Sequence, residues 1–258
     1  MNSRFEHLEF ESLEAVPAGQ RVESANQHRD YFEEAKNAFE AEAFADALRL
    51  FSRVLEFERE SQGSWLGQIH CLLQLDRIEE ATNWANHALE PFPNNSDIIA
   101  LKSVALARRG QIAEALAHSD RALRSESPSF LPWLSRAEIL VIQGDPSAEY
   151  CEERAWNITE QTWQSGWLTS RMRFLHKQKA QALKWALLAV EKAPIHATPW
   201  LQAARCQAEL NLIPQARDSI ARAHELSPDS RSIHLLRQEL EKPKGLHGIL
   251  RGLGIGKR

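Results

Sequence analysis

The sequence predicts an all-α protein, a solenoid of about six helix hairpins closed by a C-terminal capping helix. Strand signals are nearly absent, because apolar residues recur at three- and four-residue spacing and chain breakers come roughly every 15 residues. A fixed period of this kind is typical of repeat proteins. Six alanines follow one another at gaps of 34, 34, 33, 34 and 34 residues: Ala47, Ala81, Ala115, Ala148, Ala182 and Ala216.

Two further columns of small residues keep the same period. Helix axes approach to about 8 Å only where side chains are small, so each period is expected to be two antiparallel helices packed at these columns. One column lies seven residues after each alanine: Val54, Ala88, Ala122, Ala155, Ala189 and Ala223. The other lies eleven or twelve residues before it: Ala35, Ile69, Ser103, Ala137, Ser170 and Ala204.

The hairpins are expected to cover residues 28–228. Four further sets of residues recur with the same period. Bulky residues early in the first helix fill the hairpin, apolar residues begin the second helix, turn residues reverse the chain, and prolines end the hairpin. The early bulky residues are Tyr31, Trp65, Ile99, Trp133 and Trp200, and the entry residues are Phe44, Ile78, Ile112 and Ile213. The turn residues are Asp76, Gly110, Gly144 and Asn211, and the closing prolines are Pro93, Pro128, Pro194 and Pro228.

The fourth repeat departs from this pattern. Ala137 precedes Ala148 by only eleven residues, so the turn of this repeat is one residue short. Its second helix carries Cys151 beside two glutamates, Glu152 and Glu153, and is expected to be a solvated surface. The geometry of the solenoid is therefore left open at this repeat.

Three other segments complete the chain. Residues 1–27 carry five glutamates against two arginines and are expected to be largely disordered. Residues 229–241 are expected to form the capping helix, with a single apolar stripe of Ile233, Leu236 and Leu240. Residues 242–258 form a basic, glycine-rich tail with five Lys or Arg residues and no acidic residue.

The 34-residue period, the early aromatic residue, the paired alanines and the closing proline resemble tetratricopeptide repeats over about residues 28–228. This resemblance implies a right-handed solenoid in which the first helix of each hairpin lines a concave face. It also implies that this face binds peptides or helices of partner proteins. Carried over repeat by repeat, the groove positions are Phe32, Lys36, Phe39, Leu66, His70, Leu73, Val104, Arg108, Leu134, Glu138, Trp167, Arg171, Phe174, Leu201 and Arg205.

The predicted groove is mostly apolar with a minority of cations. The clamp of lysines, arginine and asparagines with which some relatives hold an acidic chain terminus is absent, because its places hold Phe32, Lys36, Gly67, Asp97 and Leu101. A chaperone C-terminal tail is therefore a poor candidate for the ligand.

Trp167 lies off the pattern, because Gly166 takes the place of the early aromatic residue in the fifth repeat. One interpretation is that Trp167, Arg171 and Phe174 form a stripe that anchors a segment with an apolar residue and a nearby carboxylate. The other is that this helix is rotated and Trp167 packs between repeats. The sequence leaves both open.

No catalytic site, metal site or cofactor is expected. The motifs HExxH, GxSxG and GxGxxG are absent, and His70 and Cys71 point about 100° apart on a helix, so they cannot converge on one ion. Cys71 and Cys206 occupy equivalent places and are expected to be buried packing residues. Three unpaired cysteines and an N-terminus without an apolar run predict a cytoplasmic protein without disulfides or a signal peptide.

The tail offers a second docking element. Leu246, Ile249, Leu250 and Leu253 form one helical stripe, but Gly248 and Gly252 each cost about 1 kcal/mol in a helix. The tail is not a phosphate-binding loop, because Arg251 stands where that motif needs its first glycine. A segment that folds on binding and a frayed solubilising tail both remain open, and weak contact with anionic lipid is compatible with its charge.

These features favour a non-catalytic scaffold, adaptor or assembly factor that binds a protein segment in its groove. A structural or regulatory subunit of a larger complex is the alternative. RNA binding is less favoured and DNA binding is not expected, because the net charge is −4 and the cations are patchy. No stretch reaches the roughly 18 apolar residues of a membrane span. The sequence does not indicate the oligomeric state.

Overall fold

The computed structural model describes residues 18–125, 129–158 and 160–241, and the structure of these residues consists of α-helices without a strand. The predicted all-α fold is therefore confirmed. The helices are α1 (Ala18–Glu40), α2 (Phe44–Phe57), α3 (Gln62–Gln74), α4 (Ile78–Leu89), α5 (Ser96–Arg108), α6 (Ile112–Leu123), α7 (Leu131–Gln143), α8 (Ala148–Ile158), α9 (Trp163–Leu175), α10 (Lys179–Lys192), α11 (Ala197–Glu209), α12 (Ile213–Leu226) and α13 (Arg231–Glu241).

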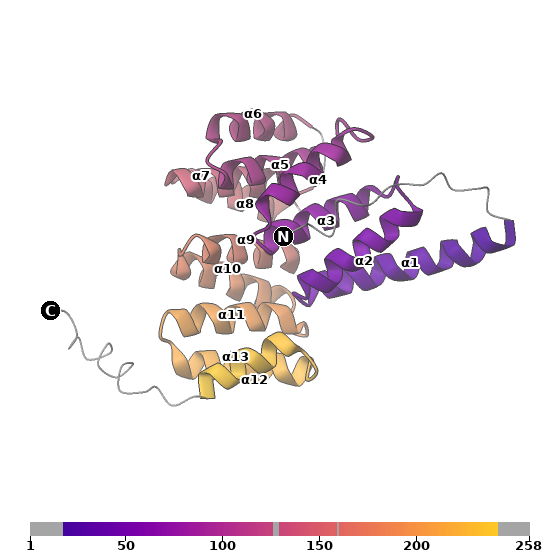
Figure 1. The fold of residues 1–258 in the computed structure, drawn as a ribbon. Helices are drawn as coiled ribbons and strands as arrows, with labels where there is room; N and C mark the ends of the chain where they lie inside the picture. The colour runs from indigo at the N-terminus through magenta and orange to yellow at the C-terminus, as the bar shows by residue number, and fades with distance from the viewer. Residues whose placement is uncertain (1–17, 126–128, 159, 242–258) are drawn as a thin grey trace, which may run out of the picture.

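The first twelve helices pair into six hairpins, and α13 follows the last one (Figure 1). The three columns of small residues lie at the helix contacts, and none of their members is more than 1% exposed. The expected entry residues Phe44, Ile78, Ile112 and Ile213 are the first residues of α2, α4, α6 and α12. Close packing at small residues therefore sets the hairpins, as the period predicts.

Each hairpin turn contains one residue with left-handed backbone geometry. These residues are Glu42, Asp76, Gly110, Gly144, Lys177 and Asn211, and successive members are 34, 34, 34, 33 and 34 residues apart. Left-handed residues commonly end helices, and glycine or asparagine accepts this conformation most readily. The four expected turn residues are among them, whereas Glu42 and Lys177 occupy the same position without the usual residue type.

The first helix begins at Ala18, so residues 18–27 are helical and do not belong to the largely disordered segment that we expected. This stretch contains good helix formers such as Gln20, Arg21 and Glu23. Its apolar residues are only Ala18, Val22 and Ala25, and such a weak stripe does not by itself predict a helix. Residues 1–17 lie outside the described residues.

The second helix of the fourth repeat is not the solvated surface that we expected. The turn spans four residues from Gly144 to Ala148, whereas Gly110 and Ala115 are five apart, and this confirms the shortened turn. Cys151 is buried, and the Glu152 side chain is 2% exposed. Arg173 of α9 pairs with Glu152, whose other oxygen accepts a hydrogen bond from the Trp185 indole at 3.1 Å.

Gly166 explains why the fifth repeat carries its tryptophan one residue late. A Cβ atom at Gly166 would lie 2.9 Å from the Trp156 ring and 3.4 Å from the Trp185 carbonyl oxygen. Trp156 of α8 instead packs edge-on against Trp185, with ring centroids 5.7 Å apart. The fourth repeat therefore supplies the aromatic ring at this junction.

The solenoid curls until its first repeat meets its fifth and sixth repeats. In Figure 1 the turn between α1 and α2 points toward the stacked helices α9 to α11. Thr198 of α11 donates a hydrogen bond to the Glu40 carbonyl oxygen at 2.6 Å, and Gln164 of α9 donates one to the Glu40 carboxylate at 3.2 Å. These contacts join residues more than 120 positions apart in the chain.

Candidate functional site

The inner side of the curl contains a cavity of about 360 Å³. Its walls come from the first helices of five consecutive repeats and from the turn of the first repeat. Nine of the predicted groove residues line it: His70, Leu73, Val104, Arg108, Leu134, Glu138, Arg171, Phe174 and Arg205. The register that we carried over from the family pattern therefore brings these residues to one place.

The apolar part of the cavity combines predicted and unpredicted residues. Leu73, Val104 and Leu134 are buried in the wall, and Leu168 and Met172 of α9 complete it. Phe174 and Leu175, at the end of α9, are more accessible, and Leu175 is 47% exposed. A ligand would therefore meet an exposed apolar rim before it reaches the buried wall.

One side of the cavity is held by a buried ion pair. Arg108 donates from Nε to Glu138 Oε1 and from Nη1 to the Leu73 carbonyl oxygen, both at 2.7 Å. The His176 Nε2 atom lies 3.0 Å from the same carboxylate oxygen. Burial alone would raise the pKa of Glu138, but the Arg108 charge and the hydrogen bonds from His176 and Arg108 outweigh it and lower this pKa to about 2.

His70 lies beside this pair and is held in its neutral form. Burial lowers the pKa of His70 to about 4, and the charges of Arg108 and Arg171 act in the same direction against the opposing effect of Glu138. The His70 ring also lies 4.9 Å from the Phe39 ring, measured between centroids. Its environment is that of a packed, uncharged side chain.

The opposite side of the cavity is occupied by Glu42, whose side chain is only 2% exposed. Three donors converge on its carboxylate. Trp167 Nε1 donates to Oε1 at 3.0 Å, Arg171 Nη1 lies 3.0 Å from the same oxygen, and Arg205 pairs with Oε2. Burial alone would raise the pKa of Glu42, but the two arginine charges and the hydrogen bonds from Arg205 and Trp167 lower it to about 2.

Aromatic rings of the first repeat contact two of the donors that hold this carboxylate. The Phe39 ring meets Trp167 edge-on at 5.7 Å, and the Arg171 guanidinium lies over the Phe44 ring at 4.6 Å. Arg171 also donates from Nε to Gln74 at 2.8 Å. The turn of the first repeat thus presents a carboxylate to α9 and α11, with one phenylalanine before it and one after it in the sequence. We call residues 39–44 the Glu42 clasp.

The remaining predicted groove residues lie outside the cavity. Trp167 is 1% exposed and Leu201 is 2% exposed, so both are packing residues. Phe32, Phe39 and Leu66 are half-buried, and Lys36 is exposed. Of the two interpretations of Trp167, the structure therefore supports packing between repeats. Its indole N–H donates a hydrogen bond to Glu42 and does not face a ligand.

Sequence reasoning did not identify Glu42, Phe44, Gln74 or His176 as parts of the site. Glu42 belongs to a turn, and its partners are 125 or more residues away. Its one local signal is a glutamate at a turn position where two other repeats carry Gly110 and Gly144. The predicted tail residues Leu246, Ile249, Leu250, Arg251 and Leu253 lie outside the described residues.

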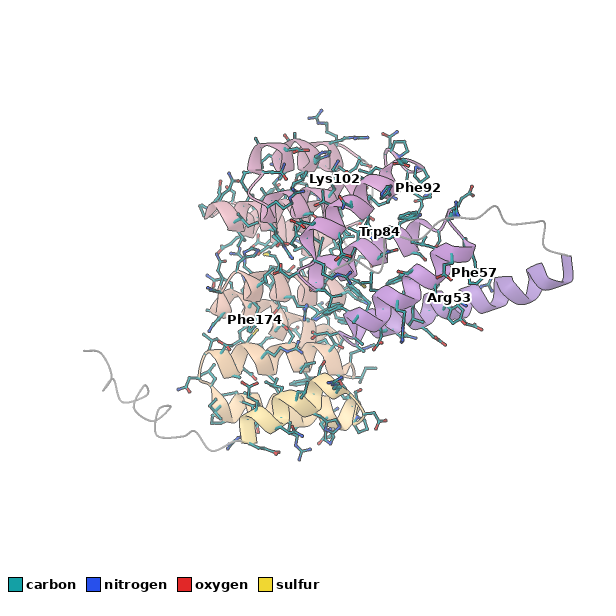
Figure 2. The ribbon with its side chains drawn as sticks, viewed as in Figure 1. Arg53, Phe57, Trp84, Phe92, Lys102 and Phe174 are labelled. Carbon is teal, nitrogen blue, oxygen red and sulfur yellow. The ribbon has the colours of Figure 1, made fainter. Side chains whose placement is uncertain are left out.

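A second hollow of about 670 Å³ lies on the outer side of the first two repeats, between α2 and α4. Leu48, Leu72 and Trp84 line it, together with Arg53 at its border. Figure 2 shows Arg53 and Phe57 together on α2, and Trp84 and Phe92 further along the same side of the molecule. The Arg53 guanidinium lies 5.2 Å from the Phe57 ring centroid, and Phe57 is 51% exposed.

Within residues 18–125, 129–158 and 160–241, no cluster of three or more His, Cys, Asp or Glu side chains is arranged to hold a metal ion. No helix in these ranges is long and apolar enough to cross a membrane. Cys71 and Cys206 are fully buried, as their equivalent positions predict, and burial raises the pKa of their thiols to about 12 and about 11.

Comparison with known proteins agrees with this geometry. Residues 38–105 match the profile of the tetratricopeptide repeat. A search of curated protein sequences found no significant match. The structure of a tetratricopeptide repeat protein from Parabacteroides merdae superposes with a TM-score of 0.52 at 14% identity, over 87% of this chain and 89% of that chain.

Human IFIT1, solved as a dimer with PPP-AAAA, superposes with a TM-score of 0.54 at 20% identity. The match covers 88% of this chain but only 58% of that chain, so the present chain spans a little over half the length of this relative. At these identities the likeness shows the fold alone.

The repeated hairpin and the buried small-residue columns give the chain the fold of tetratricopeptide-repeat proteins, and residues 38–105 match the profile of that repeat. The profile covers residues 38–105, and the hairpins that follow this segment continue the same packing. Folds of this class are interaction or assembly scaffolds.

Proposed function

We propose that the protein is a non-catalytic scaffold, adaptor or assembly factor that binds a segment of a partner protein in its inner cavity. The observation that carries this proposal is the convergence of nine groove residues from five repeats on one cavity of about 360 Å³. Ligand sites are typically concave and combine apolar walls with placed polar groups. This cavity is concave, but it is more polar than most such sites, because polar and charged residues make up about half of its lining.

The chemistry of the walls favours a segment with an apolar side chain and a nearby carboxylate. Leu134 and Met172 offer apolar surface, and Arg108, Arg171 and Arg205 supply positive charge. Each of these arginines already faces a carboxylate of the chain, so a single ligand carboxylate would have to replace one of these partners. A nucleic acid backbone, with many phosphates, would find little free positive charge in the cavity. RNA binding is accordingly the less favoured function.

The test is capture of partners by the intact chain and by a variant of the cavity rim. Leu175→Glu places a charge at an exposed rim position, so the fold should be retained while partner binding falls about tenfold or more. The matched control is Ile195→Glu, because Ile195 is 74% exposed and does not line this cavity. Equal capture by wild type and Leu175→Glu would contradict the proposal.

The tail is the proposed second docking element, built on Leu246, Ile249, Leu250, Arg251 and Leu253. A chain that ends at residue 241 should retain cavity-dependent partners and lose any partner or anionic vesicle held by the tail. A helix that appears in a synthetic tail peptide without partner or lipid would contradict coupled folding. If the protein is instead a structural or regulatory subunit, capture should recover a complex that is insensitive to Leu175→Glu.

A further inference from the structure

The Glu42 clasp places a ligand-like group in a receptor built from distant repeats. Two guanidinium groups and one indole N–H converge on a single carboxylate: Arg171, Arg205 and Trp167. Guanidinium groups bind carboxylates through paired, charge-assisted hydrogen bonds. Without an anion between them, Arg171 and Arg205 would repel each other, so this arrangement requires one.

Glu42 combines a left-handed backbone conformation with a buried, fully paired side chain. Glu42 has a φ of 59°, a left-handed conformation that is unfavourable for a residue with a side chain of this kind. The same turn position holds Gly110 and Gly144 in the third and fourth repeats. Glycine would satisfy this turn without strain, but it has no carboxylate to neutralise the two arginines.

The receptor also opens onto surface that the clasp leaves uncovered. Glu42 and Phe44 line the inner cavity together with Phe174 and Leu175, and Leu175 is 47% exposed. A carboxylate seated between Arg171 and Arg205 therefore shares its cavity with accessible apolar surface. A segment that supplies both a carboxylate and a larger apolar side chain could bury surface that the clasp does not bury.

We infer that the Glu42 clasp is an internal substitute for the partner, and that the natural ligand is a protein segment with an acidic residue next to an aromatic one, which displaces the clasp. This inference rests on the proposed function of the cavity. The clasp binds as part of the same chain and so competes at a high effective concentration. The partner must compensate for this advantage by burying its additional apolar group in the cavity.

The experiment uses a fluorescent peptide with the sequence of residues 37–47, NAFEAEAFADA, and the full-length protein. The variant Glu42→Gly removes the carboxylate and keeps the turn geometry. We expect it to bind the peptide at least tenfold more tightly than wild type, as measured by fluorescence anisotropy. A peptide with glutamine in place of Glu42 should lose this binding.

Circular dichroism is used to test whether Glu42→Gly is folded. If it is not, the double variant Gln164→Ala/Thr198→Ala replaces it, because this variant removes two tethers of the clasp and leaves Glu42 and both arginines intact. The inference is overturned if a folded, opened variant fails to bind the peptide, or if wild type binds it equally well. A wild-type dimer in light scattering that Glu42→Gly abolishes would also overturn it, since a second copy would then supply the ligand.

These outcomes separate the inference from the proposed function. If peptide binding fails while partner capture still depends on Leu175, the cavity binds partners and only the clasp interpretation is wrong. If peptide binding succeeds while capture is insensitive to Leu175→Glu, the receptor is real and the proposed partner site is wrong.

Discussion

At the scale of single residues, the six turn positions allow a direct comparison. Glu42 and Lys177 both have left-handed backbone conformations, at φ 59° and 62°. Lys177 is exposed, whereas Glu42 is buried against two arginines. The same backbone strain is therefore present at both positions, but only Glu42 has a buried ion pair to offset it.

Substitution by glycine should separate the effect of backbone strain from that of the buried ion pairs of Glu42. We expect Lys177→Gly to raise stability by about 0.5–1 kcal/mol, because it relieves the left-handed strain. Glu42→Gly relieves the same strain but strips both arginines of their anion, so it should lower stability by about 2–4 kcal/mol. Thermal unfolding followed by circular dichroism measures both changes, and similar shifts for the two variants would contradict the role of Glu42.

A second prediction at this scale concerns pH. The pKa of His70 is lowered from 6.5 to about 4, so the folded protein keeps this ring neutral while the unfolded chain binds a proton below pH 6.5. The stability contribution of neutral His70 is therefore complete above pH 6.5 and is lost as the pH falls toward 4. Urea midpoints at pH 7.5 and 5.0 measure this loss, which His70→Gln should reduce. An unchanged pH dependence in this variant would rule out His70 as its source.

At the scale of helices, the junction between the fourth and fifth repeats rests on a buried polar network. Glu152 of α8 pairs with Arg173 of α9, and both side chains are no more than 6% exposed. Burial raises the pKa of Glu152 even though the hydrogen bond and charge of Arg173 oppose this. A buried pair of this kind costs little when intact and much when one partner is removed.

Glu152→Gln should accordingly destabilise the protein by about 3 kcal/mol, because it leaves the Arg173 charge buried without its counter-ion. The matched control is Glu225→Gln, which breaks the exposed pair between Arg222 and Glu225 on α12. That change should stay within about 0.5 kcal/mol. Chemical denaturation monitored by circular dichroism compares the two, and equal losses would show that burial is not the deciding factor.

Helices and turns were largely predictable from the sequence, because they depend on residues a few positions apart. The entry residues and the turn residues Asp76, Gly110, Gly144 and Asn211 lie where the period places them. The environment of Glu152 was not predictable, because its partners Arg173 and Trp185 belong to the next repeat. A polar helix face is predicted to be solvent-exposed when the residues of the neighbouring helices are not known.

At the scale of the whole molecule, the curl of the solenoid determines the site. In most solenoids each repeat contacts only its neighbours, so curvature accumulates from small rotations that no single repeat reveals. The register of the groove positions was predictable, and nine of them meet at the cavity. The meeting of Glu42 with Arg171 and Arg205 was not, since it depends on the sum of those rotations, including that of the shortened turn after Gly144.

Closure between the first repeat and the fifth and sixth should couple their local stabilities. In hydrogen exchange followed by mass spectrometry, Glu42→Gly should speed exchange in α2, α9 and α11. Helices α4 to α6 make none of the Glu42 contacts and should be little changed. Faster exchange confined to α2 would show that the clasp does not stabilise α9 and α11.

The same contacts define how the molecule would carry tension. A force applied at the two chain ends would pass along α1 to Glu42, cross to Arg171 on α9 and Arg205 on α11, and leave through α12 and α13. Helices α2 to α8 lie between these anchor points in the sequence and would stay outside the load path while the ion pairs hold. Helices α2 to α8 would thus carry little of the applied force. The cavity walls that they contribute would keep their shape until the ion pairs of Glu42 break.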